Sequence, residues 1–79
     1  MSQREALKAE LLRTHELFQK LHAEHQQCEA RLAQLLHRSL PSPEDEVEEK
    51  RLKIRKLALK DQMEAILREA ERASVPTSR

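Results

Sequence analysis

The first half of the chain carries an apolar line with an unbroken heptad spacing. The line runs from Leu7 to Leu35, and its steps alternate between four and three residues. Such a repeat is typical of a helix that packs along a left-handed supercoiled seam. Ser2 can cap this helix, with Glu5 three residues later as in a capping box. The positions of the line are Leu7, Leu11, Thr14, Phe18, Leu21, His25, Cys28, Leu32 and Leu35.

A turn and a second helix follow in the segment SLPSPEDE. Pro41 and Pro43 cannot continue a helix interior. Ser42 is a good N-cap, Pro43 suits the first helical position, and Asp45 lies three residues after the cap. The predicted elements are helix 1 over about 3–38, a turn over 39–42, helix 2 over about 43–73 and a tail over 74–79.

Two long helices joined by so short a connection fold back as an antiparallel hairpin. If the turn is centred between residues 40 and 41, the apolar lines of the two helices match layer by layer. The facing pairs are Leu11 with Ala70, Phe18 with Met63, Leu21 with Leu59, and Cys28 with Leu52. We therefore expect a single all-α domain over 1–79, an antiparallel two-helix coiled-coil hairpin. The predicted hairpin core is Leu7, Leu11, Phe18, Leu21, Leu32, Leu59, Met63 and Ile66.

The second helix has another apolar line, about opposite the first. A simple hairpin would leave this line in water, and exposed apolar lines mark contact sites. Because a thin core is marginal in a chain of 79 residues, association with a further copy would supply the missing burial. We expect a homo-oligomer, a four-helix or larger bundle, in which a helix of another protein could take the same place. The predicted interface residues are Val47, Ile54, Leu57, Ala58 and Ala65.

Composition narrows the class of protein. The chain has no glycine, one aromatic residue, 37% charged residues and a formal net charge of +1. This composition is typical of long helices, and the near-zero charge argues against a dedicated polyanion binder. The single cysteine excludes an internal disulfide and fits a reducing compartment. No apolar stretch is long enough for a membrane span or a signal peptide, so we expect a cytoplasmic protein without membrane contact.

One histidine occupies the seam. In the hairpin register, His25 faces Lys56, and the favoured interpretation is a polar layer that fixes the register of the helices. Glu24 and Asp61 are close enough in sequence to help neutralise Lys56. A metal site is the alternative: His22, His25 and Cys28 could provide half of a zinc site completed across an oligomer. A protonation switch at His25 is a third hypothesis.

The segment KRLKIRKLALK, residues 50–60, contains six cations and no acid. We expect most of them to be solvated or paired with acids of helix 1. With one aromatic residue in the chain, no stacking platform for single-stranded bases is available. The alternative is a nucleic-acid contact through Lys50, Arg51, Lys53, Arg55 and Lys60.

Two segments resemble the YdcH-like family of small bacterial proteins. The first contains His15, Phe18 and Leu21, followed by the pair Glu24–His25. The second, LKIRKLALKDQMEAIL, begins with Leu52–Lys53 and continues to Leu59, Lys60 and Asp61. The resemblance covers about residues 15–68 and implies a small helical hairpin or coiled coil with no established enzymatic activity. The chain departs from the pattern at Cys28, where the family usually has an apolar residue, and at Ile54–Arg55, which replace a more charged pair.

The sequence predicts a binding protein rather than an enzyme. It has no glycine for a phosphate loop and no convincing nucleophile–base pair, and a thin bundle should offer little pocket. We expect no cofactor, no metal and no small-molecule substrate. The predicted function is a non-enzymatic, self-associating protein-interaction module. The alternative is a nucleic-acid-associated or transcription-linked accessory protein.

Overall fold

The computed structural model describes residues 2–74, and this part of the chain is all-helical. Helix α1 spans Gln3–Thr14, α2 spans Glu16–Leu36, and α3 spans Pro43–Ser74. The bounds of α3 agree with the predicted second helix. The predicted tail lies outside the described residues, except for Ser74, which ends α3.

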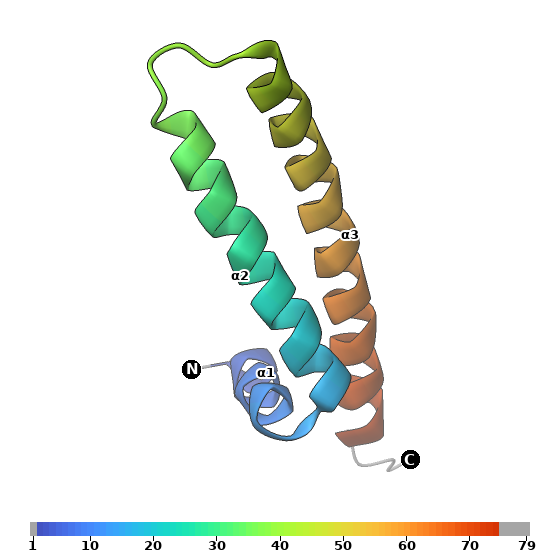
Figure 1. The fold of residues 1–79 in the computed structure, drawn as a ribbon. Helices are drawn as coiled ribbons and strands as arrows, with labels where there is room; N and C mark the ends of the chain where they lie inside the picture. Colours follow the sequence, from blue (N-terminus) through green and yellow to red (C-terminus); the bar gives the residue numbers. More distant parts are fainter. Residues whose placement is uncertain (1, 75–79) are drawn as a thin grey trace.

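Helices α2 and α3 lie side by side and run in opposite directions, joined by the loop at one end of the molecule (Figure 1). The molecule is elongated, with extents of 58 × 22 × 18 Å. Helix α1 lies across the other end, viewed almost along its axis in Figure 1, and it contacts both α2 and α3.

The prediction of one continuous helix over 3–38 is wrong, because the backbone is extended at His15, with φ −100° and ψ 110°. The His15 N–H donates to the carbonyl oxygen of Leu11 at 2.8 Å, which closes α1. The His15 Nδ1 accepts from the Phe18 N–H at 3.0 Å, which caps α2. Thr14 donates through Oγ1 to the Glu10 carbonyl oxygen at 2.9 Å, a bond of the kind that often bends helices. Thr14 is exposed and takes no seam position.

Most of the core falls into two apolar clusters along the helices, and Leu32 and Leu35 are buried in addition. One contains Leu11, Phe18 and Leu67, with Met63 and Ala70 packed against it. The other contains Leu21, Cys28 and Leu59, with Leu52 packed against it. Each facing pair that the register predicts therefore lies within one cluster. Phe18 and Leu59 are the most deeply buried side chains, at 1% and 0% exposure.

The N-terminus of α3 has the predicted cap. The Asp45 N–H donates to Ser42 Oγ at 3.1 Å, and the Ser42 N–H donates to Asp45 Oδ2 at the same distance. This reciprocal pair satisfies two backbone donors that a helix end leaves open. Arg38, from the loop, adds hydrogen bonds of 2.9 Å to both carboxylate oxygens of Asp45. The cap thus ties the loop to the start of α3.

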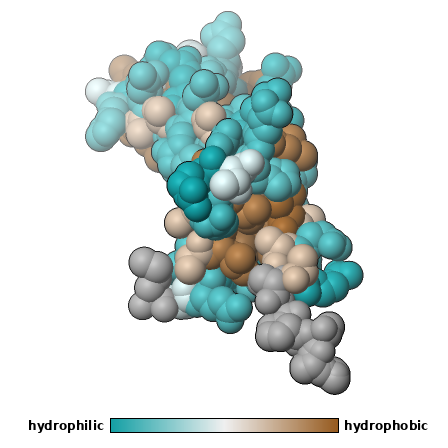
Figure 2. Space-filling view, turned by 90° about the horizontal axis from the view of Figure 1, so that it is seen from below, coloured by the Kyte–Doolittle hydropathy of each residue, from teal (hydrophilic) through white to brown (hydrophobic). Residues whose placement is uncertain are grey.

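The surface keeps apolar areas exposed. Seen from the end opposite the loop, hydrophobic surface is visible between hydrophilic side chains (Figure 2). None of the described helices is long and apolar enough to cross a membrane.

Candidate functional site

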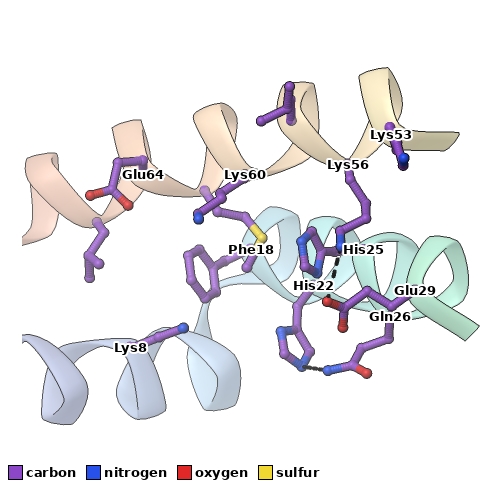
Figure 3. Close-up of a pocket in the computed structure, with 13 residues that line it drawn as sticks. Lys8, Phe18, His22, His25, Gln26, Glu29, Lys53, Lys56, Lys60 and Glu64 are labelled. Carbon is purple, nitrogen blue, oxygen red and sulfur yellow. Dashed lines mark hydrogen bonds and ion pairs between the residues drawn. The ribbon is translucent and has the colours of Figure 1, made fainter. Parts of the chain in front are cut away.

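A cleft of about 600 Å³ opens between the three helices (Figure 3). This volume corrects the expectation that a thin helical protein would offer little pocket. The break at His15 places Lys8 of α1 at this cleft, and the other lining residues belong to α2 and α3. Its apolar part is formed by Phe18, Leu57, Met63 and Leu67. Its basic part is formed by Lys8, His22, His25, Lys53, Lys56 and Lys60.

Ion pairs hold α1 at the edge of the cleft. Arg4 pairs with Glu64 through Nη2 and with Glu71 through Nε, the second at 3.2 Å. The hydrogen bond to Glu64 is the largest cause of the raised pKa of the Arg4 guanidinium. Gln19 of α2 donates to the Leu12 carbonyl oxygen at 2.9 Å, which fixes the path from α1 into α2. Together with the burial of Leu11, these contacts place Lys8 on one wall of the cleft.

His25 and Lys56 both line the cleft, and Figure 3 shows them close together. Both are half-buried, at the rim of the α2–α3 contact. The carboxylate that pairs with Lys56 is Glu29, with a Nζ–Oε2 distance of 3.3 Å. The two carboxylates that were expected to help neutralise Lys56 do not pair with it: Glu24 pairs with Arg55, and Asp61 is exposed.

The proposed metal ligands are not assembled into a cluster. His22 Nε2 lies 3.4 Å from the amide nitrogen of Gln26, on the cleft side of α2. Cys28 is a free thiol buried against Leu21 and Leu59. Within residues 2–74, no group of three or more histidine, cysteine, aspartate or glutamate side chains could hold a metal ion.

Ion pairs use three cations of the segment 50–60, two of them between α2 and α3 and one within α3. Arg55 pairs with Glu24, and Lys56 pairs with Glu29. Lys53 pairs with Glu49, one turn earlier in α3, at 2.9 Å. Hydrogen bonding to Glu24 is the main cause of the raised pKa of Arg55. Half of the six cations over 50–60 are therefore paired with carboxylates.

A further pair, Arg31 with Glu48, joins the loop-side halves of α2 and α3. Arg31 donates from Nε at 2.7 Å and from Nη2 at 2.9 Å to the two Glu48 oxygens. These bonds are the largest cause of the lowered pKa of Glu48 and the raised pKa of Arg31. Such a two-point contact fixes geometry more strongly than a single ion pair.

The second apolar line of α3 is largely exposed, and only Ala58 within it is half-buried. We call Val47, Ile54, Ala58 and Ala65 the outer line. Val47 and Ile54 are 51% and 68% exposed. Leu57, at 63% exposure, instead lines the cleft. The structure thus separates Leu57 from the other four predicted interface residues.

The predicted hairpin-core residues differ in depth. Leu11, Phe18, Leu21, Leu32 and Leu59 are buried. Leu7, Met63 and Ile66 are half-buried and pack against the clusters.

Of the nucleic-acid candidates, Lys50, Arg51 and Lys60 are exposed and form no ion pair within residues 2–74.

The heptad pattern did not reveal the cleft. A continuous helix over 3–38 would place Lys8 in line with the hairpin rather than across the cleft from Lys60. The signal that could have located the break was Thr14 on the apolar line, since a short polar side chain competes for backbone hydrogen bonds.

Comparison with known families identifies the family of this chain. The sequence model of DUF465, described as a protein of unknown function, matches residues 18–67. The chain belongs to the DUF465 family, which includes the YdcH proteins. The match covers most of α2, the loop and most of α3 but excludes α1. No match to a curated protein or to a solved structure was found.

Proposed function

We propose that this DUF465 protein is a non-enzymatic interaction module that self-associates through the outer line of α3. The observation that carries the proposal is the exposure of Ile54, at 68%, in the middle of α3. Val47 and Ala65 extend the line on either side, over about 27 Å at 1.5 Å per residue. An apolar line of this length on a charged helix is a favourable contact surface.

A second copy of the chain complements the outer line in an antiparallel arrangement. With the two α3 helices centred on each other near residue 56, Val47 of each copy lies opposite Ala65 of the other. Ile54 then lies opposite Ala58, so that each large apolar side chain faces a small one. On one flank of this contact, Lys50 comes close to Asp61 of the other copy. Size and charge are therefore both compatible with a twofold pair.

The arrangement would complete the four-helix packing that the sequence favours. Two α2–α3 pairs would meet through α3, and the cleft would remain open on another side of α3. Contacts of this kind are isologous and close after two copies. We therefore propose a dimer, with the hairpin as its coiled-coil unit, rather than an open chain of copies.

The test is light scattering coupled to size exclusion on the wild type and on Ile54→Glu. We expect a dimer for the wild type at micromolar concentration and a monomer for the variant, because each dimer would bury two carboxylates at its centre. The measurement is repeated with zinc and with a chelator, which separates apolar association from assembly through His22, His25 and Cys28.

Leu36→Glu is the matched control. Leu36 is 67% exposed, about as much as Ile54, but it belongs to α2. The control should stay dimeric. A monomeric wild type, or equal loss of the dimer in both variants, would contradict the proposal.

A further inference from the structure

Helix α1 covers apolar residues of α2 and α3 at the end of the molecule opposite the loop (Figure 1). The covered residues, which we call the end surface, are Phe18, Met63 and Leu67. From α1, Leu11 is buried in the cluster that contains them, and Leu7 and Leu12 are half-buried against the same cluster. The end surface is therefore completed by a helix that belongs to neither member of the α2–α3 pair.

The attachment of α1 is slight. Of its 12 residues, only Leu11 is buried, whereas α2 buries side chains along its length from Phe18 to Leu35. The other contacts of α1 include the ion pairs of Arg4, whose side chains are 36–44% exposed, and exposed ion pairs contribute little to stability. An element with few buried contacts opens at a lower free energy than the rest of a fold.

The connection from α1 to α2 is a hinge of one residue. His15 is extended, and helix begins again at Glu16. Residues 3–36 contain no proline and no glycine, so the sequence also permits helical angles at His15. Short hinges of this kind favour the exchange of an element between two copies of a chain.

We propose that α1 is a detachable cover and that the end surface is a docking site for α1 of a second copy. The incoming helix makes the same apolar contacts and the same Arg4 ion pairs as the chain's own α1, so its complementarity is the one present in the structure. The family match, residues 18–67, contains the whole end surface but not its cover. The contact goes beyond the proposed self-association, because α1 has no part in the outer line.

The experiment is a titration of the full-length variant Leu11→Asp with a synthetic peptide of residues 2–15, followed by backbone amide NMR shifts. A carboxylate is costly to bury in an apolar cluster, so the variant should leave the end surface uncovered. We expect saturable shifts around Phe18, Met63 and Leu67. The wild-type protein should bind the peptide about tenfold more weakly or less, because its own α1 competes at an effective concentration on the order of millimolar.

Ala9→Asp is the matched control. Ala9 is exposed on α1, so this variant adds the same charge to the same helix without removing a cluster side chain, and it should bind the peptide as weakly as the wild type. A peptide that itself carries Leu11→Asp should not bind. Equal binding of the two peptides, or no binding of the wild-type peptide to the Leu11→Asp protein, would overturn the proposal. If that protein loses the helicity of α2 and α3, Arg4→Glu, at an exposed position, takes its place and should bind the peptide more tightly than the wild type.

Docking between whole chains is tested with a complementary pair of variants. Glu64→Lys/Glu71→Lys repels Arg4 and weakens the docking of its own α1, whereas the Leu11→Asp protein keeps both glutamates. Isotope-labelled Leu11→Asp protein mixed with the unlabelled double variant should show the shifts seen with the peptide. Their absence would show that a second copy does not dock there. The peptide contains no residue of α3 and cannot form the outer-line contact, so this proposal and the proposed dimer succeed or fail separately.

Discussion

At the scale of single residues, Asp45 shows how one carboxylate serves several contacts. Its backbone and side chain exchange hydrogen bonds with Ser42, and Arg38 binds its two oxygens. The hydrogen bond from the Ser42 backbone, followed by the contacts with Arg38, holds the pKa of Asp45 below its usual value against an opposing effect of burial. The sequence predicted the Ser42 cap. It did not predict Arg38, because the loop path that brings Arg38 back depends on how α2 ends.

The lowered pKa of Asp45 predicts a pH-dependent contribution to stability. A carboxylate with a lowered folded-state pKa stabilises the fold above its unfolded pKa, which is about 3.9, and this contribution is lost as the pH falls through the folded-state pKa. We expect Asp45→Asn to lower Tm at pH 7 and to differ less and less from the wild type below about pH 4. Thermal unfolding followed by circular dichroism from pH 7 to pH 2.5 measures the difference.

Glu46→Gln provides the control for this prediction. Glu46 is an exposed neighbour in the same helical turn and accepts no hydrogen bond from Arg38 or Ser42. Its Tm should stay close to that of the wild type at pH 7. A difference between Asp45→Asn and the wild type that stays constant down to pH 2.5 would show that the carboxylate charge is not what matters.

At the scale of helices, the break between α1 and α2 decides the shape of the protein. The heptad spacing continues from Thr14 to Phe18 without interruption, and the chain is helical on both sides of the break at His15. The His15 side chain replaces one backbone acceptor at the start of α2, which offsets part of the hydrogen bonding lost at the break. Burial of Leu11 and the ion pairs of Arg4 then favour the docked arrangement.

His15→Ala should destabilise the protein by about 1 kcal/mol, the usual effect of losing an N-cap side chain. For a domain of this size, that corresponds to a Tm decrease of about 4–8 °C. His15→Asp retains a side-chain acceptor of a preferred N-cap type and should keep Tm near the wild-type value. The measurement is thermal denaturation of the three proteins at one concentration. A Tm for His15→Ala equal to that of His15→Asp would mean that the cap does not hold the break.

At the scale of the whole molecule, charge is balanced locally as well as in total. The net charge is +1, and Lys53, Arg55 and Lys56 are each paired with a carboxylate. Affinity for nucleic acid depends on cations that neutralise phosphates and release counterions. Pairing within the protein lowers the number of cations that can do so.

We therefore expect no mobility shift with double-stranded DNA or with RNA at low salt and micromolar protein. Glu24→Gln frees Arg55 from its partner and provides a variant with more available positive charge. If the wild type binds, and binding weakens steeply as salt is raised, the nucleic-acid alternative replaces the interaction module. The assay uses the same preparations as the scattering experiment, so association and binding can be compared directly.

The sequence by itself determined the helical class, the turn before Pro43 and the apolar residues that pair α2 with α3. These features depend on local geometry: proline ends a helix, serine caps one, and a regular apolar spacing places side chains on one face. Only the tertiary structure decided where the first helix breaks and which carboxylate meets Lys56. It also decided that Lys8 lies across a cleft from Lys60. Those outcomes depend on small free-energy differences between competing contacts. The contacts that decide them form only when α1, α2 and α3 pack against one another.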